Sequence, residues 1–229
     1  MKICIINVAT NKYIKFINPL WQSIRKNFLI NHQVESLLFT NHDINPVTKN
    51  GKISKIEHEP FPIPTLMRYH YIDSEFEYLS EFDYCFYLDA DMFIENKVDE
   101  EILSELVATL HPGFYNKNIN NFSYDRNPSS TAFINFNDGS KYYAGGFQGG
   151  ATKKYLEAVK FMKNNIDVDL SNGIIAEWHD ESHWNKYLLQ NKPTLELDPS
   201  YCYPESWSIP FNRIILALDK NHEEVRRLD

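Results

Sequence analysis

Two aspartates separated by a single residue, Asp89 and Asp91, are the first candidates for chemistry in this sequence. They follow the apolar run Tyr84–Leu88, which contains no glycine or proline and is typical of a buried strand in an open sheet. Ligands bind at the carboxyl ends of the strands in open α/β sheets. Two carboxylates spaced in this way can share one hard divalent cation, which can also bind a substrate diphosphate. The alternative is an acidic turn that only caps the next segment, because a lone Asp-x-Asp is a weak motif.

A second group of ionisable side chains occupies residues 177–183, which read Glu-Trp-His-Asp-Glu-Ser-His. Acidic residues at the start of a helix interact favourably with its dipole, so capping explains one of them but not all. Arg68 raises the opposite question, because a cation near the start of a predicted helix opposes that dipole. A carboxylate or a bound anion beside Arg68 would explain its position, and a solvated arginine is the alternative.

Three further segments are candidates for ligand contact. Residues 142–150 hold half of the chain's eight glycines, which indicates either a bulge or a backbone that another group approaches closely. Residues 116–138 are rich in Asn, Ser and Pro and are too long for an ordinary connection, which favours a binding loop. Residues 219–227 add cations to an acidic chain, and a flexible solvated terminus is the alternative there.

The elements that must position these side chains alternate between strands and helices, which is the signature of an α/β fold. The predicted strands are residues 2–8, 35–40, 52–57, 84–88 and 213–218, and the predicted helices are residues 18–29, 65–79, 99–106, 151–164 and 184–189. Asn18 is the expected N-cap of the first helix. Three prolines within residues 60–64 exclude regular structure there, and Thr65 is expected to cap the next helix.

Composition limits the classes of function. A chain of 229 residues with 43% hydrophobic residues fits one large domain with a substantial core. The net charge of -8 argues against nucleic acid as the main partner, so any phosphate site must be local. The three cysteines are far apart in apolar surroundings and are expected to be reduced, buried thiols. There is no signal peptide and no apolar run of about 20 residues, so we expect a soluble cytoplasmic protein with no membrane span.

Six motifs occur in a fixed order along the chain. They are Leu-Asp-Ala-Asp at residues 88–91, Leu-His-Pro-Gly-Phe-Tyr at 110–115, Phe-Ser-Tyr-Asp-Arg at 122–126, Tyr-Tyr-Ala-Gly-Gly-Phe at 142–147 with Gly-Gly at 149–150, Trp-His-Asp-Glu-Ser at 178–182 with Asn-Lys-Tyr at 185–187, and Lys-Asn-His at 220–222 with Val-Arg at 225–226. Taken together, the chain resembles glycosyltransferase family 6, the family of the blood-group A and B transferases and the α-1,3-galactosyltransferase. The similarity is greatest to its short bacterial and viral-type members.

The resemblance implies a GT-A fold, an α/β architecture in which a Rossmann-like nucleotide-sugar-binding domain has a central mixed sheet flanked by helices. It implies one catalytic domain over residues 1–229, with a uridine- and metal-binding part at about 1–95, a donor and acceptor part at about 96–212 and a basic tail at 213–229. The implied activity is a retaining α-1,3-transfer of GalNAc or Gal from a UDP-sugar to a β-galactoside, fucosylated or not. The implied cofactor is Mn²⁺ or another divalent cation.

The resemblance also implies roles for individual residues on the donor side. Val8, Thr10 and Tyr13 fall where the family holds uridine. Asp89 and Asp91 match the motif that holds the metal and the UDP diphosphate, and Lys220 and Arg226 match tail residues that close over that diphosphate. The positions that match contacts to the donor sugar are Arg68, Ala144, Gly145, Gly146, His179 and Asp180.

On the acceptor side, His111, Ser123 and Trp178 fall where the family holds the acceptor galactose, and the family often has Thr at the position of Ser123. Glu181 matches the carboxylate proposed as the catalytic nucleophile or stabiliser, and it also faces the acceptor. A carboxylate at an anomeric carbon can form a glycosyl intermediate or stabilise an oxocarbenium-like transition state.

The chain departs from the family in several places. We expect no counterpart of the anchor and stem of the mammalian members. Many bacterial members have asparagine at both metal-binding positions, whereas this chain keeps Asp89 and Asp91. We therefore expect metal dependence. Small residues at Ala144 and Gly146 leave room for a 2-acetamido group, which favours UDP-GalNAc over UDP-Gal. Pro-Glu at residues 204–205 differs from the mammalian acceptor-side sequence and leaves the acceptor beyond a terminal galactose open.

Two other functions compete with glycosyl transfer. One is a lectin-like module that binds sugar or nucleotide without turnover, although a pure binder needs no nucleophile such as Glu181. The other is a metal-dependent phosphoester hydrolase built on Asp89, Asp91 and His179, which would release UDP and sugar without an acceptor. Analysis of the products with and without an acceptor separates the three.

Overall fold

The main sheet is mixed and has β4, the strand before the two aspartates, at its centre. The computed structural model describes residues 1–226, and within them seven strands follow the order β3-β2-β1-β4-β7-β6-β8. Their bounds are β1 Lys2–Val8, β2 Gln33–Thr40, β3 Lys52–Lys55, β4 Tyr84–Leu88, β6 Val107–Leu110, β7 Tyr143–Ala151 and β8 Leu195–Leu197. The first four strands are parallel, and β7 is antiparallel to both of its neighbours. The α/β fold with a central mixed sheet, expected from the sequence, is confirmed.

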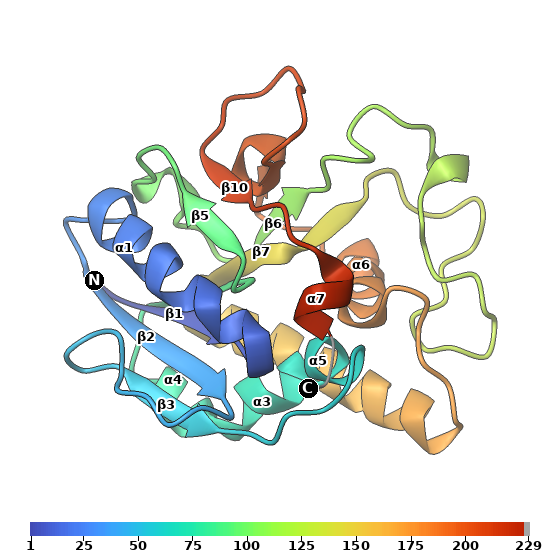
Figure 1. Cartoon of the computed structure of the whole chain (residues 1–229). Helices are drawn as coiled ribbons and strands as arrows, with labels where there is room; N and C mark the ends of the chain where they lie inside the picture. Colours follow the sequence, from blue (N-terminus) through green and yellow to red (C-terminus); the bar gives the residue numbers. More distant parts are fainter. Residues whose placement is uncertain (227–229) are drawn as a thin grey trace.

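Both faces of this sheet are buried. Along β1, Ile3 and Ile5 pack with Trp21 of α1 (Ile17–Asn27) in one hydrophobic cluster, whereas Cys4 and Ile6 pack in a second cluster on the other face. That second cluster includes side chains of α3 (Arg68–Ser74), α5 (Thr152–Ser171) and α6 (His179–Gln190). Figure 1 shows α1 on one side of β1 and α3 and α5 on the other. Burial on both faces explains why these strands are continuous apolar runs and were easy to predict.

The glycine-rich segment forms strand β7, in which the backbone is approached closely. A Cβ atom on Gly149 would lie 2.3 Å from the backbone oxygen of Cys85 on β4, so no larger residue fits there without a shift. The register between β6 and β7 also shifts between Ala108 and Thr109. The sequence predicted either a bulge or a backbone that another group approaches closely. The shifted register and the contact at Gly149 show that both features are present.

A second, three-stranded sheet within residues 1–226 brings the end of the chain back to the aspartates. It has the order β5-β10-β9, in which β10 (Ile215–Ala217) pairs antiparallel with β5 (Met92–Ile94) and parallel with β9 (Tyr203–Pro204). The amide of Leu218 then donates to the carbonyl of Asp91 at 2.9 Å. The helix α7 (His222–Arg226) follows, with Val225 buried and Glu224 paired to Lys15. The tail up to residue 226 is therefore packed rather than a flexible terminus, and residue 227 lies outside the described residues.

Several predicted helix boundaries are wrong. The helix α1 begins at Ile17, because the 3₁₀ helix η1 (Asn11–Phe16) runs directly into it, and Asn18 is not its N-cap. The predicted helix at residues 65–79 is divided into α2 (Ile63–Leu66), α3 and α4 (Phe76–Leu79). The helix α2 begins among the prolines, since a proline in a first turn loses no helical hydrogen bond, so Thr65 lies inside the helix and does not cap it.

Two further predictions failed because tertiary contacts override local preference. In the predicted helix at residues 99–106, only the 3₁₀ helix η2 (Glu100–Ile102) forms. Beyond it the chain bends at residues 104–106, where Ser104 accepts from Ala151 and Leu106 exchanges hydrogen bonds with Thr194, before β6 begins at Val107. The helix α6 begins at His179, well before the predicted start at residue 184. The remaining short elements are η3 Ile119–Asn121 and η4 Pro199–Cys202.

The three cysteines, Cys4, Cys85 and Cys202, are buried free thiols, as expected. Burial raises the pKa of each thiol, which keeps all three protonated and unreactive. Within residues 1–226, no helix combines the length and the apolar character needed to cross a bilayer.

Candidate active site

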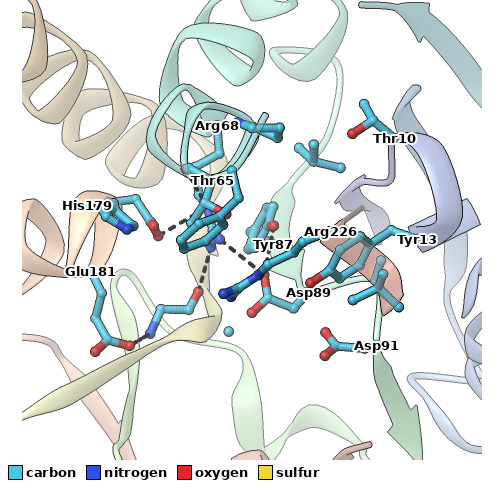
Figure 2. A pocket seen from close by; sticks show the side chains of 18 of the residues that line it. Thr10, Tyr13, Thr65, Arg68, Tyr87, Asp89, Asp91, His179, Glu181 and Arg226 are labelled. Atoms are coloured by element: carbon cyan, nitrogen blue, oxygen red, sulfur yellow. Dashed lines mark hydrogen bonds and ion pairs between the residues drawn. The ribbon is translucent and has the colours of Figure 1, made fainter. Parts of the chain in front are cut away.

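A pocket opens at the carboxyl ends of β1 and β4 and contains all but three of the residues singled out in the sequence (Figure 2). Adjacent parallel strands end at the same edge of the sheet, so the loops that follow β1 and β4 meet there. The predicted residues that line the pocket are Val8, Thr10, Tyr13, Arg68, Asp89, Asp91, Gly145, Gly146, Trp178, His179, Asp180, Glu181, Lys220 and Arg226. They come from six separate parts of the chain, and the sheet and the packed tail bring them together.

Arg68 lies at the centre of the charged side of this pocket and is buried (Figure 2). Its guanidinium donates to Oδ1 of Asp89 at 3.1 Å and to the carbonyl of Gly145 at 3.0 Å, and its Nε lies 3.1 Å from Oδ2 of Asp180. It also stacks over the ring of Tyr87, 4.2 Å from its centroid. Burial opposes the charge of Arg68, but Asp180 and Asp89 outweigh it and hold its pKa above the ordinary value. The carboxylates of Asp89 and Asp180 explain why an arginine occurs at the start of a helix. The alternative prediction, an arginine exposed to solvent, is wrong.

Asp180 is a buried carboxylate in the first turn of α6. Burial raises its pKa, and the negative charges of Asp89 and Glu181 add to the effect, while Arg68 opposes it. A buried carboxylate that has a single cationic neighbour depends strongly on that neighbour, because an unpaired buried charge is costly. Asp180 and Arg68 therefore form one unit that fixes the start of α6 against the edge of the sheet.

Asp91 is buried and is paired with the tail. Its Oδ2 contacts the ammonium group of Lys220. Burial raises the pKa of Asp91 and the charge of Asp89 raises it further, whereas Lys220 lowers it. The tail thus supplies a counter-charge to one of the two strand-end aspartates.

The protein side chains alone do not complete a metal site, but the two aspartates are chemically suitable ligands for a cation. Among residues 1–226, no three His, Cys, Asp or Glu side chains converge to form a metal cage. Asp89 and Asp91 line the same pocket and offer carboxylate oxygens, which hard divalent cations prefer. Such cations commonly take their remaining ligands from substrate phosphates and water. The two aspartates therefore fit a cation that is bound together with a diphosphate.

Glu181 lies on the other side of the pocket (Figure 2), and both of its carboxylate oxygens accept hydrogen bonds. The hydroxyl of Tyr142 donates to Oε1 at 2.8 Å, and the amide of Gly145 donates to Oε2 at 2.8 Å. The adjacent residue, Gly146, faces the opposite acid, since a Cβ atom on it would lie 3.1 Å from Oδ2 of Asp89. Two neighbouring residues of β7 thus connect the strand-end aspartates with Glu181 in a single site.

Comparison with known proteins agrees with this geometry. The sequence model described as Glycosyltransferase family 6 matches residues 1–227. The chain belongs to this family. It is 34% identical over 231 residues to the histo-blood group ABO system transferase 1 of Rattus norvegicus, covering 95% of this chain and 66% of that protein. It is 32% identical over 234 residues to the globoside alpha-1,3-N-acetylgalactosaminyltransferase 1 of Gallus gallus, covering 95% and 67%.

A bacterial relative matches over nearly its full length. The O-antigen biosynthesis glycosyltransferase WbnI of Escherichia coli is 27% identical over 227 residues, which cover 97% of each chain. By contrast, this family 6 chain spans about two thirds of the length of the rat and chicken relatives, 66% and 67% respectively. The membership and fold expected from the six motifs are confirmed.

The tail of this family 6 protein lies over the pocket. The guanidinium of Arg226 lies 3.6 Å from the ring centroid of Phe61, and the ring of His179 packs edge-on against the same phenylalanine at 5.2 Å. His179 has a positive φ of 51°, which a non-glycine residue adopts only when its surroundings hold it there. Residues from the tail, from α6 and from the segment before α2 therefore meet at the mouth of the pocket.

Three of the predicted site residues, His111, Ser123 and Ala144, do not line the pocket. Ala144 is buried in the hydrophobic cluster beneath β7. The ring of His111 packs edge-on against Tyr142 at 5.6 Å, and the carbonyl of Ser123 lies 3.3 Å from the Tyr142 hydroxyl. The two predicted acceptor residues are thus linked to Glu181 through Tyr142.

Sequence reasoning missed part of the pocket wall. The missed lining residues are His58, Glu59, Phe61, Pro64, Thr65, Tyr87, Ala90 and Val225. Most of them belong to the proline-containing segment before α3, where residue type gives no sign of a ligand. Tyr87 could have been found, because residues two apart on a strand share a face and Tyr87 precedes Asp89 by two. Its hydroxyl donates to Oδ1 of Asp89 at 2.9 Å.

Proposed function

We propose that this protein transfers GalNAc or Gal from a UDP-sugar to a β-galactoside acceptor, in an α-1,3 linkage with retention of anomeric configuration. The observation that carries the proposal is the arrangement of acids in one pocket. Asp89 and Asp91 follow strand β4, and Glu181 lines the same pocket with both carboxylate oxygens hydrogen-bonded. The names of the rat and chicken relatives, an ABO system transferase and a globoside α-1,3-N-acetylgalactosaminyltransferase, support the same reaction class.

In this proposal the nucleotide binds along the edge between β1 and β4. Val8, Thr10 and Tyr13 contact the uridine, and Asp89 and Asp91 hold a divalent cation, Mn²⁺ or a similar ion, against the diphosphate. When bound, the cation supplies positive charge that offsets the charge developing on the departing UDP. Lys220 and Arg226 reach the pocket from the tail and add to this effect.

Glu181 acts on the sugar in this proposal. As the bond from the anomeric carbon to the UDP oxygen breaks, its electron pair leaves with UDP and positive charge develops on the sugar ring. The carboxylate of Glu181 stabilises that charge or bonds to the anomeric carbon. The acceptor oxygen then bonds to the same carbon, any bond from that carbon to Glu181 breaks, and the hydroxyl proton passes to a phosphate oxygen of the departing UDP. The tail over the pocket mouth excludes water, which would otherwise hydrolyse the donor.

The preference for GalNAc over Gal is proposed from the small residues of β7. Gly145 and Gly146 line the pocket, and neither carries a side chain that would collide with an acetamido group. The Cβ position of Gly146 is itself filled by neighbours, since a Cβ atom there would lie 2.5 Å from Cε of Met92 and 3.1 Å from Oδ2 of Asp89. Ala144 does not line the pocket, and the size argument therefore applies to the two glycines alone.

The proposal is tested by measuring UDP release from UDP-GalNAc and UDP-Gal with Mn²⁺, with and without lactose or 2'-fucosyllactose. We expect release that depends on the acceptor, is faster with UDP-GalNAc and is abolished by EDTA. Asp91→Asn should remove most of the response to Mn²⁺. Binding without turnover would indicate a lectin-like module instead. Release of UDP and free sugar at the same rate without an acceptor would indicate a phosphoester hydrolase.

A further inference from the structure

The orientation of Glu181 depends on one side chain that was not predicted as part of the site. A glutamate side chain has several rotatable bonds, and it loses roughly 1.5–2 kcal/mol of rotamer entropy when it is fixed. The Gly145 amide holds one oxygen of Glu181, and the Tyr142 hydroxyl, 39 residues away along the chain, holds the other. Two donors on opposite oxygens fix both the position and the plane of the carboxylate.

The Tyr142 hydroxyl is itself held in place. Its ring is buried in an aromatic cluster, 4.5 Å from Phe114 and 5.4 Å from Tyr124, measured between ring centroids. The carbonyl of Ser123 is a second possible acceptor at 3.3 Å, but a hydroxyl has one proton to donate. The carboxylate at 2.8 Å is closer and charged, so it receives that proton. Burial, together with the negative charge of Glu181, raises the pKa of Tyr142, which keeps the hydroxyl protonated as a donor.

We propose that Tyr142 is a positioning residue for the reaction, which holds the carboxylate of Glu181 toward the anomeric carbon of the donor sugar. The inference rests on the proposed function. Among residues 1–226, the Tyr142 hydroxyl donates to Glu181 and to no other side chain that lines the pocket, and Tyr142 joins the residues proposed for the acceptor, His111 and Ser123, to that acid. Its hydroxyl therefore acts on turnover through the geometry of Glu181 and not through affinity for UDP.

The chain contains a matched comparison in the next residue. Tyr143 is also a buried tyrosine on β7, and its hydroxyl donates to a carboxylate oxygen of Glu196 on β8. Successive side chains of a strand point to opposite faces, and neither Tyr143 nor Glu196 lines the pocket. Tyr142→Phe and Tyr143→Phe therefore each remove one hydroxyl that donates to a carboxylate, and the two variants differ in whether that carboxylate is Glu181.

The first experiment compares kcat, KM for donor and acceptor, and the Kd for UDP with Mn²⁺ in the wild type and both variants. We expect Tyr142→Phe to lower kcat about 10- to 100-fold, the range for loss of a hydrogen bond to a charged group, with the UDP Kd unchanged within about twofold. Tyr143→Phe should leave kcat within about twofold. Equal losses of kcat in the two variants, or a defect of Tyr142→Phe confined to KM for the acceptor, would overturn the inference.

A double-mutant cycle with Glu181→Gln separates positioning from a structural role. If Tyr142 acts through Glu181, then adding Tyr142→Phe to Glu181→Gln lowers kcat little further, whereas independent effects would multiply. Crystal structures of the wild type and Tyr142→Phe with UDP give a readout without turnover, in which we expect Glu181 to rotate away from Gly145 in the variant. An unmoved carboxylate would contradict the inference. A wild-type protein that releases no UDP with any acceptor would instead refute the proposed function.

Discussion

The two sides of the pocket are built from different chemistry. The donor side is a network of charges, in which Arg68 joins Asp89 and Asp180 while Lys220 pairs with Asp91. The side proposed for the acceptor lies beyond Glu181, outside the residues that line the pocket, and is an uncharged aromatic cluster that surrounds Tyr142. Glu181 takes one hydrogen bond from each side, from Gly145 and from Tyr142. The charged side suits a diphosphate and the aromatic side suits a neutral sugar, which supports the proposed assignment of the donor to one side and the acceptor to the other.

The largest effect is expected from removing the cation at the centre of the donor side. Arg68→Met leaves Asp180 as a buried carboxylate without its cationic partner, and breaking a buried pair in this way costs about 3–5 kcal/mol. We expect the free energy of unfolding in urea to fall by that amount and UDP binding to be lost. Arg25→Met, at an exposed arginine of α1, should change stability by no more than about 0.5 kcal/mol.

The double variant Arg68→Met with Asp180→Asn sharpens this result. It removes both charges, so it should recover part of the stability lost in Arg68→Met alone. If the double variant is less stable than the single variant, the two side chains do not form the unit that the structure indicates.

The next effect is expected at the boundary between the two sides. Glu181→Gln keeps the size of the side chain and removes its charge, so it should lower kcat by about two orders of magnitude or more while UDP affinity stays nearly unchanged. Steady-state kinetics and calorimetric titration with UDP measure the two quantities. Near-normal turnover in this variant would remove Glu181 from its proposed role.

A smaller effect is expected from the tail. Lys220→Ala removes the cation that pairs with Asp91, and loss of one charge-assisted contact corresponds to about a tenfold weaker affinity for UDP in the presence of Mn²⁺. Lys15→Ala, which removes an exposed ion pair to Glu224 of the same tail, should leave the affinity within about twofold. Calorimetric titration compares the two. Equal losses would mean that Lys220 serves only to pack the tail.

The smallest effect is expected on the acceptor side. Nδ1 of His111 accepts the amide proton of Gly113 at 3.0 Å, and burial lowers the pKa of His111, so the neutral ring carries its proton on Nε2. His111→Phe keeps an aromatic ring and loses this donor, which should raise KM for the acceptor about 3- to 10-fold. KM for the donor should not change. A change in KM for the donor instead would mean that His111 acts on donor binding, which would contradict its assignment to the acceptor side.

The charged side was the more predictable one. Asp89, Asp91 and the acids of residues 177–183 stand out in the sequence because charges clustered beside apolar runs have few structural explanations. The long buried strands were also predictable, because their apolar runs of 4–8 residues are distinctive. In contrast, the contacts of the aromatic side could not be predicted from the sequence. A tyrosine that only packs in a core and a tyrosine that orients a carboxylate give the same sequence pattern.

The failures have a common physical cause. Residues 103–106 are not helical because their backbone bonds to Ala151 and Thr194, which are distant in the sequence. Tyr142 reaches Glu181 only because β7 and α6 pack side by side. Ala144, predicted at the donor sugar with Gly145 and Gly146, is buried and does not line the pocket, and its role in donor choice stays a prediction. Each of these facts depends on contacts between elements, which local sequence patterns do not contain.

A crystal structure with Mn²⁺, a non-hydrolysable UDP-GalNAc analogue and lactose tests the central claim most directly. The account predicts a cation between Asp89, Asp91 and the diphosphate, with the anomeric carbon facing the carboxylate of Glu181 and the lactose galactose beside His111. A sugar bound with its anomeric carbon turned away from Glu181, or a nucleotide bound outside the pocket between β1 and β4, would contradict it.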